Sequence, residues 1–173
     1  VTISIGGAND APTAVDDDYT TVEDVPIAFN APGVLWNDTD PDGDTLMAVL
    51  DGEPAHGTLV LDADGSLTYT PDENYYGSDS FTYHASDGTL NSNTATVTID
   101  IAPVNDAPQT VDDPYVTSMN TSLVAAAPGV LANDSDAEGD GLTAILDTQP
   151  PTGELAFFAD GSFVYTPTQD YTG

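Results

Sequence analysis

Residues 58–70 read TLVLDADGSLTYT, which is the pattern of a β-hairpin. Two short runs alternate apolar and polar side chains, and the turn 62–65 (DADG) separates them. Alternation with a period of two places the apolar side chains on one face of a strand, and the glycine supplies the positive φ of a tight turn. A related stretch, ELAFFADGSFVYT, stands at residues 154–166, so the sequence predicts this hairpin twice.

The two hairpins belong to an internal repeat. A shift of 96 positions aligns residues 1–77 with 97–173 without a gap, and 39 of these 77 pairs are identical. The opening VTISI matches VTIDI at 97–101, which ends a repeat, so we expect a window cut from a tandem array. The predicted parts are the last strand of a preceding repeat (1–8), a complete repeat (9–104) and a second repeat that lacks its last strands (105–173).

The complete repeat contains short strand candidates separated by turn residues. No segment shows a sustained helical period, although 32–37 has the length of one helical turn. Many short strands in about 96 residues are typical of an antiparallel sandwich. We therefore predict an all-β chain of tandem immunoglobulin-like β-sandwich domains. The expected strands are 18–21, 26–30, 45–50, 58–61, 66–70, 80–83 and 95–101.

The charge balance excludes several classes of function. The chain has 30 acidic side chains, no Lys and no Arg, for a formal charge of −30. Without cations it has no basic patch for nucleic acid. The absence of Cys excludes disulfides and thiolate metal sites, and no apolar run approaches the ~20 residues of a membrane span. Disorder does not fit, because 39% of the residues are hydrophobic and fall in alternating runs.

One loop concentrates the acids. Residues 38–44 read DTDPDGD, with Asp38, Asp40, Asp42 and Asp44 at alternate positions and a glycine for a sharp turn. Ca²⁺ takes six to eight oxygen ligands, largely from carboxylates and carbonyls. Four carboxylates within seven residues are expected to lie a few ångströms apart and to repel one another unless a divalent cation joins them. The pattern therefore favours calcium over the alternative, a solvated acidic loop built of Asx-turns.

The recurring motifs point to a family. NDAP, APGVLxND, DxDGD, ADGS and YTP in this sequence resemble the cadherin-like, bacterial immunoglobulin-like tandem repeats of large secreted (RTX-type) adhesins. The resemblance covers essentially the whole chain. It implies an extracellular or cell-surface spacer whose partners are neighbouring repeats or neighbouring copies in a fibre. Glycans or a host or biofilm surface would be met through other parts of the protein.

A more distant likeness to the cadherin repeat implies Ca²⁺ ligands where successive domains join. At the junction before the first complete repeat these would be Asn9, Asp10, Asp40, Asp42 and Asp87, with Asp44 beside them. At the junction after it they would be Glu23, Asp72, Glu73, Asn105, Asp106, Asp136 and Glu138, with Asp140 beside them. Two departures weaken the second repeat's own set: Met119 stands at the place of Glu23, and the Ala-x-Asp motif that holds Asp87 has no counterpart.

An enzyme is not expected. His56 and His84 stand in no catalytic motif and are predicted to be ordinary surface residues. Two other functions remain open. In one, residues 1–5 complete the open second repeat of a neighbour and join copies into a filament. In the other, the chain binds carbohydrate through an aromatic platform, although core positions are the favoured interpretation for the tyrosines. The platform residues would be Trp36, Tyr69, Tyr75, Tyr76 and Tyr83.

Overall fold

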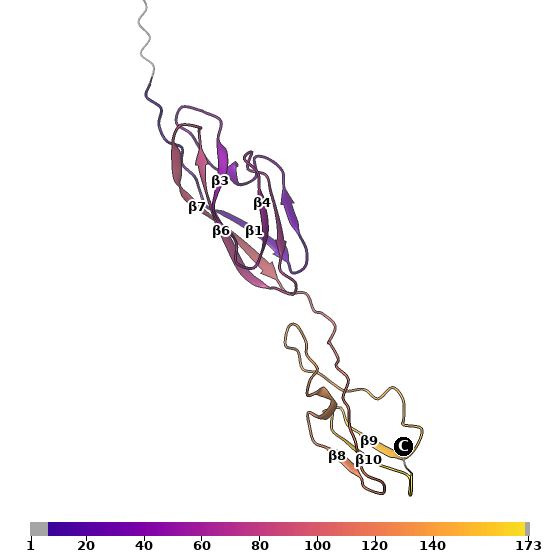
Figure 1. Cartoon of the computed structure of the whole chain (residues 1–173). Helices are drawn as coiled ribbons and strands as arrows, with labels where there is room; N and C mark the ends of the chain where they lie inside the picture. Colours follow the sequence, from indigo (N-terminus) through magenta and orange to yellow (C-terminus); the bar gives the residue numbers. More distant parts are fainter. Residues whose placement is uncertain (1–6, 172–173) are drawn as a thin grey trace, which may run out of the picture. The chain divides into compact units, whose positions relative to one another are not determined.

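The computed structural model describes residues 7–171, and the chain divides into two compact units, Val1–Val104 and Asn105–Gly173 (Figure 1). Most of the strand predicted at 1–8 lies outside the described residues. Within the described part, no helix has the length and apolar character needed to cross a membrane.

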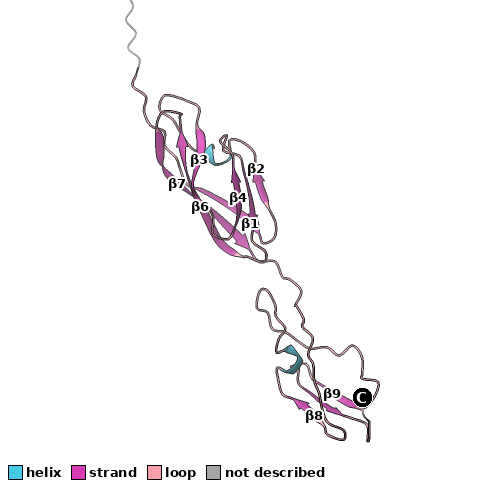
Figure 2. Cartoon of the chain, in the orientation of Figure 1, coloured by secondary structure: helices cyan, strands magenta, loops and turns pink. Residues whose placement is uncertain are grey.

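The first unit is a sandwich of two sheets (Figure 2). One has the order β1-β7-β6-β3 and the other β2-β5-β4. All neighbouring strands are antiparallel except β1 and β7, which run parallel. The strands are β1 (Asp17–Val22), β2 (Ile27–Phe29), β3 (Met47–Gly52), β4 (Gly57–Leu61), β5 (Leu67–Pro71), β6 (Gly77–Ser86) and β7 (Asn91–Ala102). Each overlaps a predicted strand, so the all-β sandwich is confirmed, and a 3-10 turn η1 (Gly33–Leu35) occupies the predicted helical turn.

The quoted hairpin is β4–β5, with Leu61 opposite Leu67. Gly65 has a φ of +84°, as the turn requires. A Cβ on Gly65 would also lie 2.0 Å from the carbonyl oxygen of Pro32, because the hairpin turn packs directly on η1. The N–H of Val34 donates to the carbonyl oxygen of Gly65 at 3.1 Å. This contact explains why the APGVL and ADGS motifs recur together in the sequence.

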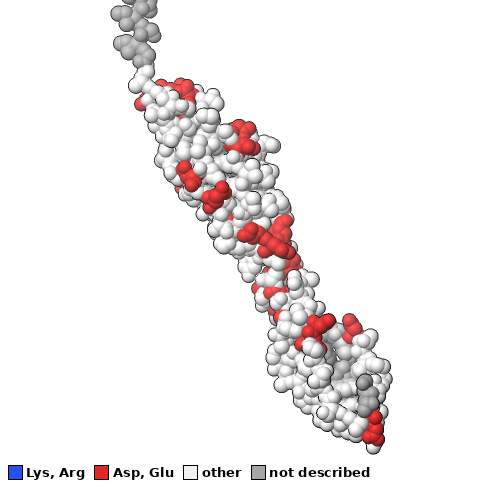
Figure 3. Space-filling view, in the orientation of Figure 1, with Lys and Arg blue, Asp and Glu red and all other residues white. Residues whose placement is uncertain are grey.

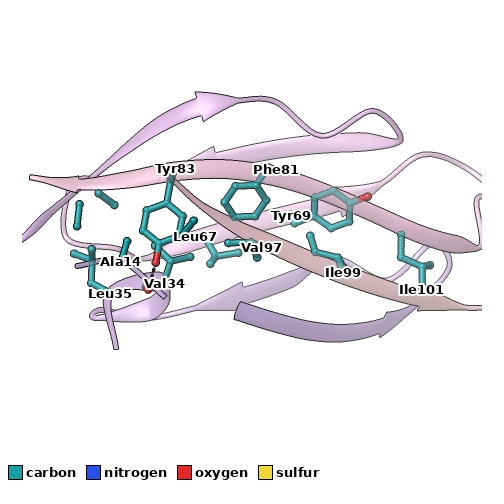
Figure 4. Close-up of a cluster of buried hydrophobic side chains, with 13 residues drawn as sticks. Ala14, Val34, Leu35, Leu67, Tyr69, Phe81, Tyr83, Val97, Ile99 and Ile101 are labelled. Carbon is teal, nitrogen blue, oxygen red and sulfur yellow. Dashed lines mark hydrogen bonds between the residues drawn. The ribbon is translucent and has the colours of Figure 1, made fainter. Parts of the chain in front are cut away.

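The core lies between the two sheets (Figure 4). Alternate residues of β6 and β7, among them Phe81, Tyr83 and Ile99, face Leu67 and Tyr69 of β5, and all five side chains are buried. The tyrosines of this set are therefore core residues, as the favoured interpretation predicted. They form no sugar-binding platform.

The second unit contains one sheet, of order β8-β10-β9, and a 3-10 turn η2 (Gly129–Leu131). Its strands β8 (Leu123–Ala125), β9 (Glu154–Phe157) and β10 (Phe163–Thr166) correspond to β2, β4 and β5. Residues 113–118 and 143–148, which correspond to β1 and β3, form no strand in the described part of this unit. The reason lies in the pairing: β1 pairs only with β7, and β3 only with β6. The described residues after β10, 167–171, contain no counterpart of either partner.

Candidate metal-binding site

The start of the first unit brings distant polar residues together. The backbone N–H of Asp10 donates to Oδ2 of Asp42 at 2.8 Å, and Nδ2 of Asn9 donates to Oδ2 of Asp87 at 2.7 Å. The linker residues thus meet the two acidic loops that the likeness to the cadherin repeat implied as their partners.

Asp40 organises the acidic loop. Its Oδ1 accepts the backbone N–H groups of Asp42 at 2.9 Å and Asp44 at 3.0 Å, and Gly43 completes the turn with a φ of +79°. This is an Asx-turn arrangement. Oδ2 of Asp40 is buried and has no hydrogen-bond partner among the described residues. The carboxylate therefore shapes the loop with one oxygen and leaves the other available.

Asp38 turns away from this loop. Its Oδ1 accepts the N–H of Val15 at 2.9 Å, and its Oδ2 lies 3.0 Å from the hydroxyl of Tyr83. Asp17 lies beside the same hydroxyl, and burial together with the negative charge of Asp38 raises the pKa of Asp17 to about 6. The carboxylates of Asp38, Asp40 and Asp42 therefore have different partners. In the described part of the first unit, no three carboxylates offer oxygens within 4.8 Å of one another.

The second unit repeats the arrangement. The N–H of Asp106 donates to Oε2 of Glu138 at 3.0 Å, as Asp10 donates to Asp42, and the N–H of Asp140 donates to Oδ1 of Asp136 at 2.9 Å. One carboxylate oxygen of Asp106 lies within 4.8 Å of one of Glu138. Oε1 of Glu138 is buried and has no hydrogen-bond partner among the described residues.

Each unit has an acidic pocket next to its 3-10 turn. The pocket of the second unit encloses about 260 Å³, and that of the first about 420 Å³. Carboxylate and amide oxygens around a hollow suit a hard cation such as Ca²⁺. The acids of the second pocket are Asp106, Asp134, Asp136 and Asp140, with the amide of Asn105, and those of the first are Asp38, Asp40, Asp44 and Asp64.

Glu23 lies at the other end of the first unit and is only 2% exposed. One of its oxygens accepts the N–H of Val104, the residue before the linker, in a short hydrogen bond. The other, Oε2, is buried and has no hydrogen-bond partner among the described residues. Burying a carboxylate is costly unless it is paired, and this chain has no Lys or Arg to pair with it.

Asp72 and Glu73 are exposed and lie in the turn after β5. This turn is tied to the residue after Glu23, because the N–H of Asn74 donates to Oδ1 of Asp24 at 3.0 Å. No hydrogen bond of the described residues joins the side chain of Asp72 or Glu73 to that of Glu23. Their role as ligands stays a prediction.

The sequence analysis missed Asp79, which is 4% exposed. Its carboxylate accepts the N–H groups of Ala55, His56 and Ser80 at 2.9–3.0 Å and the hydroxyl of Tyr69 at 2.7 Å. It thus ties β6 to β5 and to the loop before β4. A signal was present, because Asp79 alternates with Phe81 and Tyr83 and so lies on the same, inward face of the strand.

Trp36 and the two histidines were predicted to lie at the surface, and the structure gives the exposure and the neighbours of each. Trp36 is 79% exposed. His56 is exposed and stacks on Tyr75, with ring centroids 4.0 Å apart. His84 is half-buried, and its Nδ1 lies 2.8 Å from Oδ1 of Asp51. His84 thus has an acidic partner that the sequence did not indicate.

Comparison with known proteins shows which family and which relatives the chain resembles. A family model described as bacterial cadherin-like domain matches residues 9–103 and 105–173. "Protein GAMETE EXPRESSED 2" of Arabidopsis thaliana is 38% identical over 100 residues, and "Integrin beta-like protein A" of Dictyostelium discoideum is 37% identical over 116 residues. Each match covers 58% of this chain but only 10% and 6% of those proteins.

Solved structures show the same fold. The structure "PcdhgB3 EC1-4" has a TM-score of 0.57 and 17% identity, over 94% of this chain and 42% of that one. The structure of the extracellular cadherin domains 1–5 of Protocadherin Gamma B2 has a TM-score of 0.55 and 17% identity, over 94% and 33%. Cadherin-like domains are extracellular, of an adhesion type, typically non-enzymatic, and typically bind Ca²⁺. Both units of this chain match the family model, and the chain belongs to the bacterial cadherin-like domain family.

Proposed function

We propose that the chain is a calcium-rigidified extracellular stalk or spacer of a bacterial surface adhesin or fibre. The observation that supports this most is the repeated contact at the start of each unit, where a linker N–H donates to an acidic side chain: Asp10 to Asp42, and Asp106 to Glu138. Because the same contact recurs in both units, it supports a site that belongs to the repeat.

The proposed ligands at the linker come from both sides of Val104. Glu23 accepts the N–H of Val104, the linker residues follow directly in the chain, and Asp106 is bonded to Glu138. Two of these side chains, Glu23 and Glu138, each have a buried oxygen without a hydrogen-bond partner in the described part. The full proposed set is Glu23, Asp72, Glu73, Asn105, Asp106, Asp136, Glu138 and Asp140.

A matching ion is proposed at the start of the first unit, held by Asn9, Asp10, Asp40, Asp42, Asp44 and Asp87. Extracellular calcium modules typically bind with dissociation constants of ~10⁻⁴–10⁻³ M. In this proposal bound Ca²⁺ neutralises the repulsion between neighbouring carboxylates. Because these carboxylates then share one ion, the motion of the linker is restricted. The partners are then neighbouring repeats or copies, and other parts of the protein meet glycans or a surface.

Calorimetric titration of the chain with CaCl₂ tests this function. We expect Glu138→Gln to weaken binding at one site by tenfold or more, because an amide offers one oxygen and no charge. Glu154→Gln is the matched control: it is the same change in the same unit, at an exposed position of β9. Calcium binding by Glu138→Gln equal to that of the unchanged chain would contradict the proposed linker site.

A further inference from the structure

In the first unit, the chain enters at one end of the sandwich and leaves at the opposite end (Figure 1). The first strand after the entry is β1 and the last strand before the exit is β7, and these two are parallel neighbours in one sheet. Their register runs from Asp17 opposite Val97 to Val22 opposite Ala102. A pull on the two ends of the unit draws β1 by its first residue and β7 by its last. The two strands are therefore pulled past each other along their length.

Side chains extend the contact of β1 with β7 at the entry end. Asn93 of β7 binds the backbone of Ala14 twice: its Nδ2 donates to the carbonyl oxygen at 2.9 Å, and its Oδ1 accepts the N–H at 3.2 Å. Further along β7, the N–H of Thr96 donates to Oδ1 of Asp16 at 2.7 Å. The entering segment is thus fixed to β7 before the first pair of the two strands is reached.

The exit end is closed by Glu23, the residue after β1. Its N–H donates to the carbonyl oxygen of Ala102 at 2.9 Å, and its carboxylate accepts the N–H of Val104. Glu23 is buried, so these bonds are shielded from water. Hydrogen bonds between the entering segment 14–23 and the leaving segment 93–104 therefore extend beyond the strand pairing at both ends.

We propose that the contact of segments 14–23 and 93–104 is a shear clamp, through which the first unit bears tension along the chain. Under such tension the hydrogen bonds between β1 and β7 lie across the pulling direction and share the load, so many must fail together. A load that separates the same strands sideways reaches their bonds one after another. A stalk is pulled along its chain, so this role rests on the proposed function, whereas the clamp itself needs no bound ion.

Single-molecule stretching of the whole chain tests the dependence on direction. The chain has no cysteine of its own, so introduced cysteines define the points of attachment. Attachment at Ala11→Cys and Pro103→Cys loads the clamp in shear. Attachment at Ala11→Cys and Asn91→Cys, the first residue of β7, peels the entering segment from β7. At the same force we expect the unit to unfold at least tenfold more slowly under the shear attachment.

A pair of asparagine variants tests the side-chain contact at the entry end. Under the shear attachment, Asn93→Ala removes both bonds to Ala14 and should speed unfolding fivefold or more. Asn91→Ala is the matched control, because it is the same change at an exposed position of the same strand, and it should alter the rate less than twofold. Melting curves of the two variants show that both fold.

A pair of proline variants tests the backbone bonds. Neighbouring residues of a strand turn their backbone groups to opposite sides, and the N–H of Glu23 faces β7. The N–H of Thr21 therefore also faces β7, whereas that of Thr20 faces the free edge of the sheet. Proline is tolerated where the N–H of an edge strand faces solvent. Thr21→Pro should therefore unfold at least threefold faster under shear than Thr20→Pro.

Equal unfolding rates under the two attachments would overturn the proposal. So would a rate under shear that neither Asn93→Ala nor Thr21→Pro changes. Each measurement is made in Ca²⁺ and in EGTA. The difference between the attachments should persist in EGTA even if Ca²⁺ fails to stiffen the linker, so failure of the clamp and failure of the proposed function give different results.

Discussion

At the scale of single residues, the acidic side chains fall into groups that composition does not distinguish. Asp79 is a buried structural acceptor, Asp38 faces the Tyr83 hydroxyl, and Asp40 shapes a loop while one of its oxygens stays without a hydrogen-bond partner in the described part. In the described part of the chain, Asp40, Glu23 and Glu138 are the acids with a buried oxygen that has no hydrogen-bond partner, which suits a metal ligand. The distinction predicts different results for the same Asp→Asn change at different positions.

Asp79→Asn should destabilise the first unit by about 3 kcal/mol, because hydrogen bonds to a charged acceptor contribute about 1.5–3 kcal/mol each. In addition, the NH₂ group of the new amide would face N–H and O–H groups that donate to the carboxylate in the unchanged chain. Burial acts to raise the pKa of Asp79, but the hydrogen bonds from Tyr69, Ala55, His56 and Ser80 outweigh it and hold the pKa below its usual range. Urea unfolding followed by circular dichroism measures the loss. Asp100→Asn, on the exposed face of β7, should stay within about 0.5 kcal/mol of the unchanged chain.

The contribution of Asp17 to stability should depend on pH in the direction opposite to that of Asp79, because the pKa of Asp17 is raised and that of Asp79 is lowered. Its pKa is raised from 3.8 to about 6, so the folded state holds the proton more tightly than the unfolded state. The stability that this proton contributes is present below pH 3.8 and is lost as the pH rises through about 6. In EGTA, Asp17→Asn should therefore melt at a higher temperature than the unchanged chain at pH 7.5, and the difference should shrink toward pH 4.5. The exposed neighbour Asp18 is the control, since Asp18→Asn should show no such trend. A difference that does not vary with pH would contradict this account of Asp17.

At the scale of elements, the hairpin turn on the 3-10 turn is the contact common to both units. Gly65 faces the Pro32 carbonyl in the first unit, and Gly161 faces that of Pro128 in the second, each with room for hydrogen only. Both glycines have positive φ angles. A larger residue at either position would therefore be opposed both by the backbone conformation and by the contact with the 3-10 turn.

Gly65→Ala and Gly43→Ala separate these two effects. The φ angles are similar, +84° and +79°, but a Cβ on Gly43 meets nothing within 4 Å. Gly43→Ala should cost about 1 kcal/mol from the strained backbone alone. Gly65→Ala should cost at least twice as much, because the hairpin must also move away from η1. Urea unfolding in EGTA measures both, and equal losses would mean that the contact with η1 has no energetic role.

Much of the element structure could be predicted from the sequence, because alternation and turn residues are local signals. The seven strands and the hairpin turn at Gly65 follow from them. The parallel pairing of β1 with β7 does not, since local patterns do not name a strand's partner. For the same reason the sequence did not indicate that residues 113–118 and 143–148 would fail to form strands when their partners are missing.

Local sequence patterns also do not show which residues of the candidate site come together. The meeting of Asn9 with Asp87 was implied only by resemblance, because 78 residues separate them. The inward orientation of Asp38 was not foreseen, since the spacing of acids in a loop does not fix where each carboxylate points. Asp72 and Glu73 were assigned by motif alone, and they remain predictions.

At the scale of the whole molecule, the formal charge is all of one sign, negative. Figure 3 shows acidic side chains in separate groups on the visible face, and the sequence has no Lys or Arg to pair with them. At physiological ionic strength the Debye length is about 8 Å, so repulsion acts mainly within such groups. A bound divalent cation removes it there, which links the composition to the proposed stiffening of the linker.

Small-angle X-ray scattering of the 173-residue chain, in 5 mM CaCl₂ and in 5 mM EGTA, tests the calcium-rigidified stalk most directly. We predict that Ca²⁺ narrows the distribution of interatomic distances and fixes the maximum dimension, whereas EGTA gives the broad distribution of two units on a free linker. Superimposable distributions in the two buffers would contradict calcium-dependent rigidity.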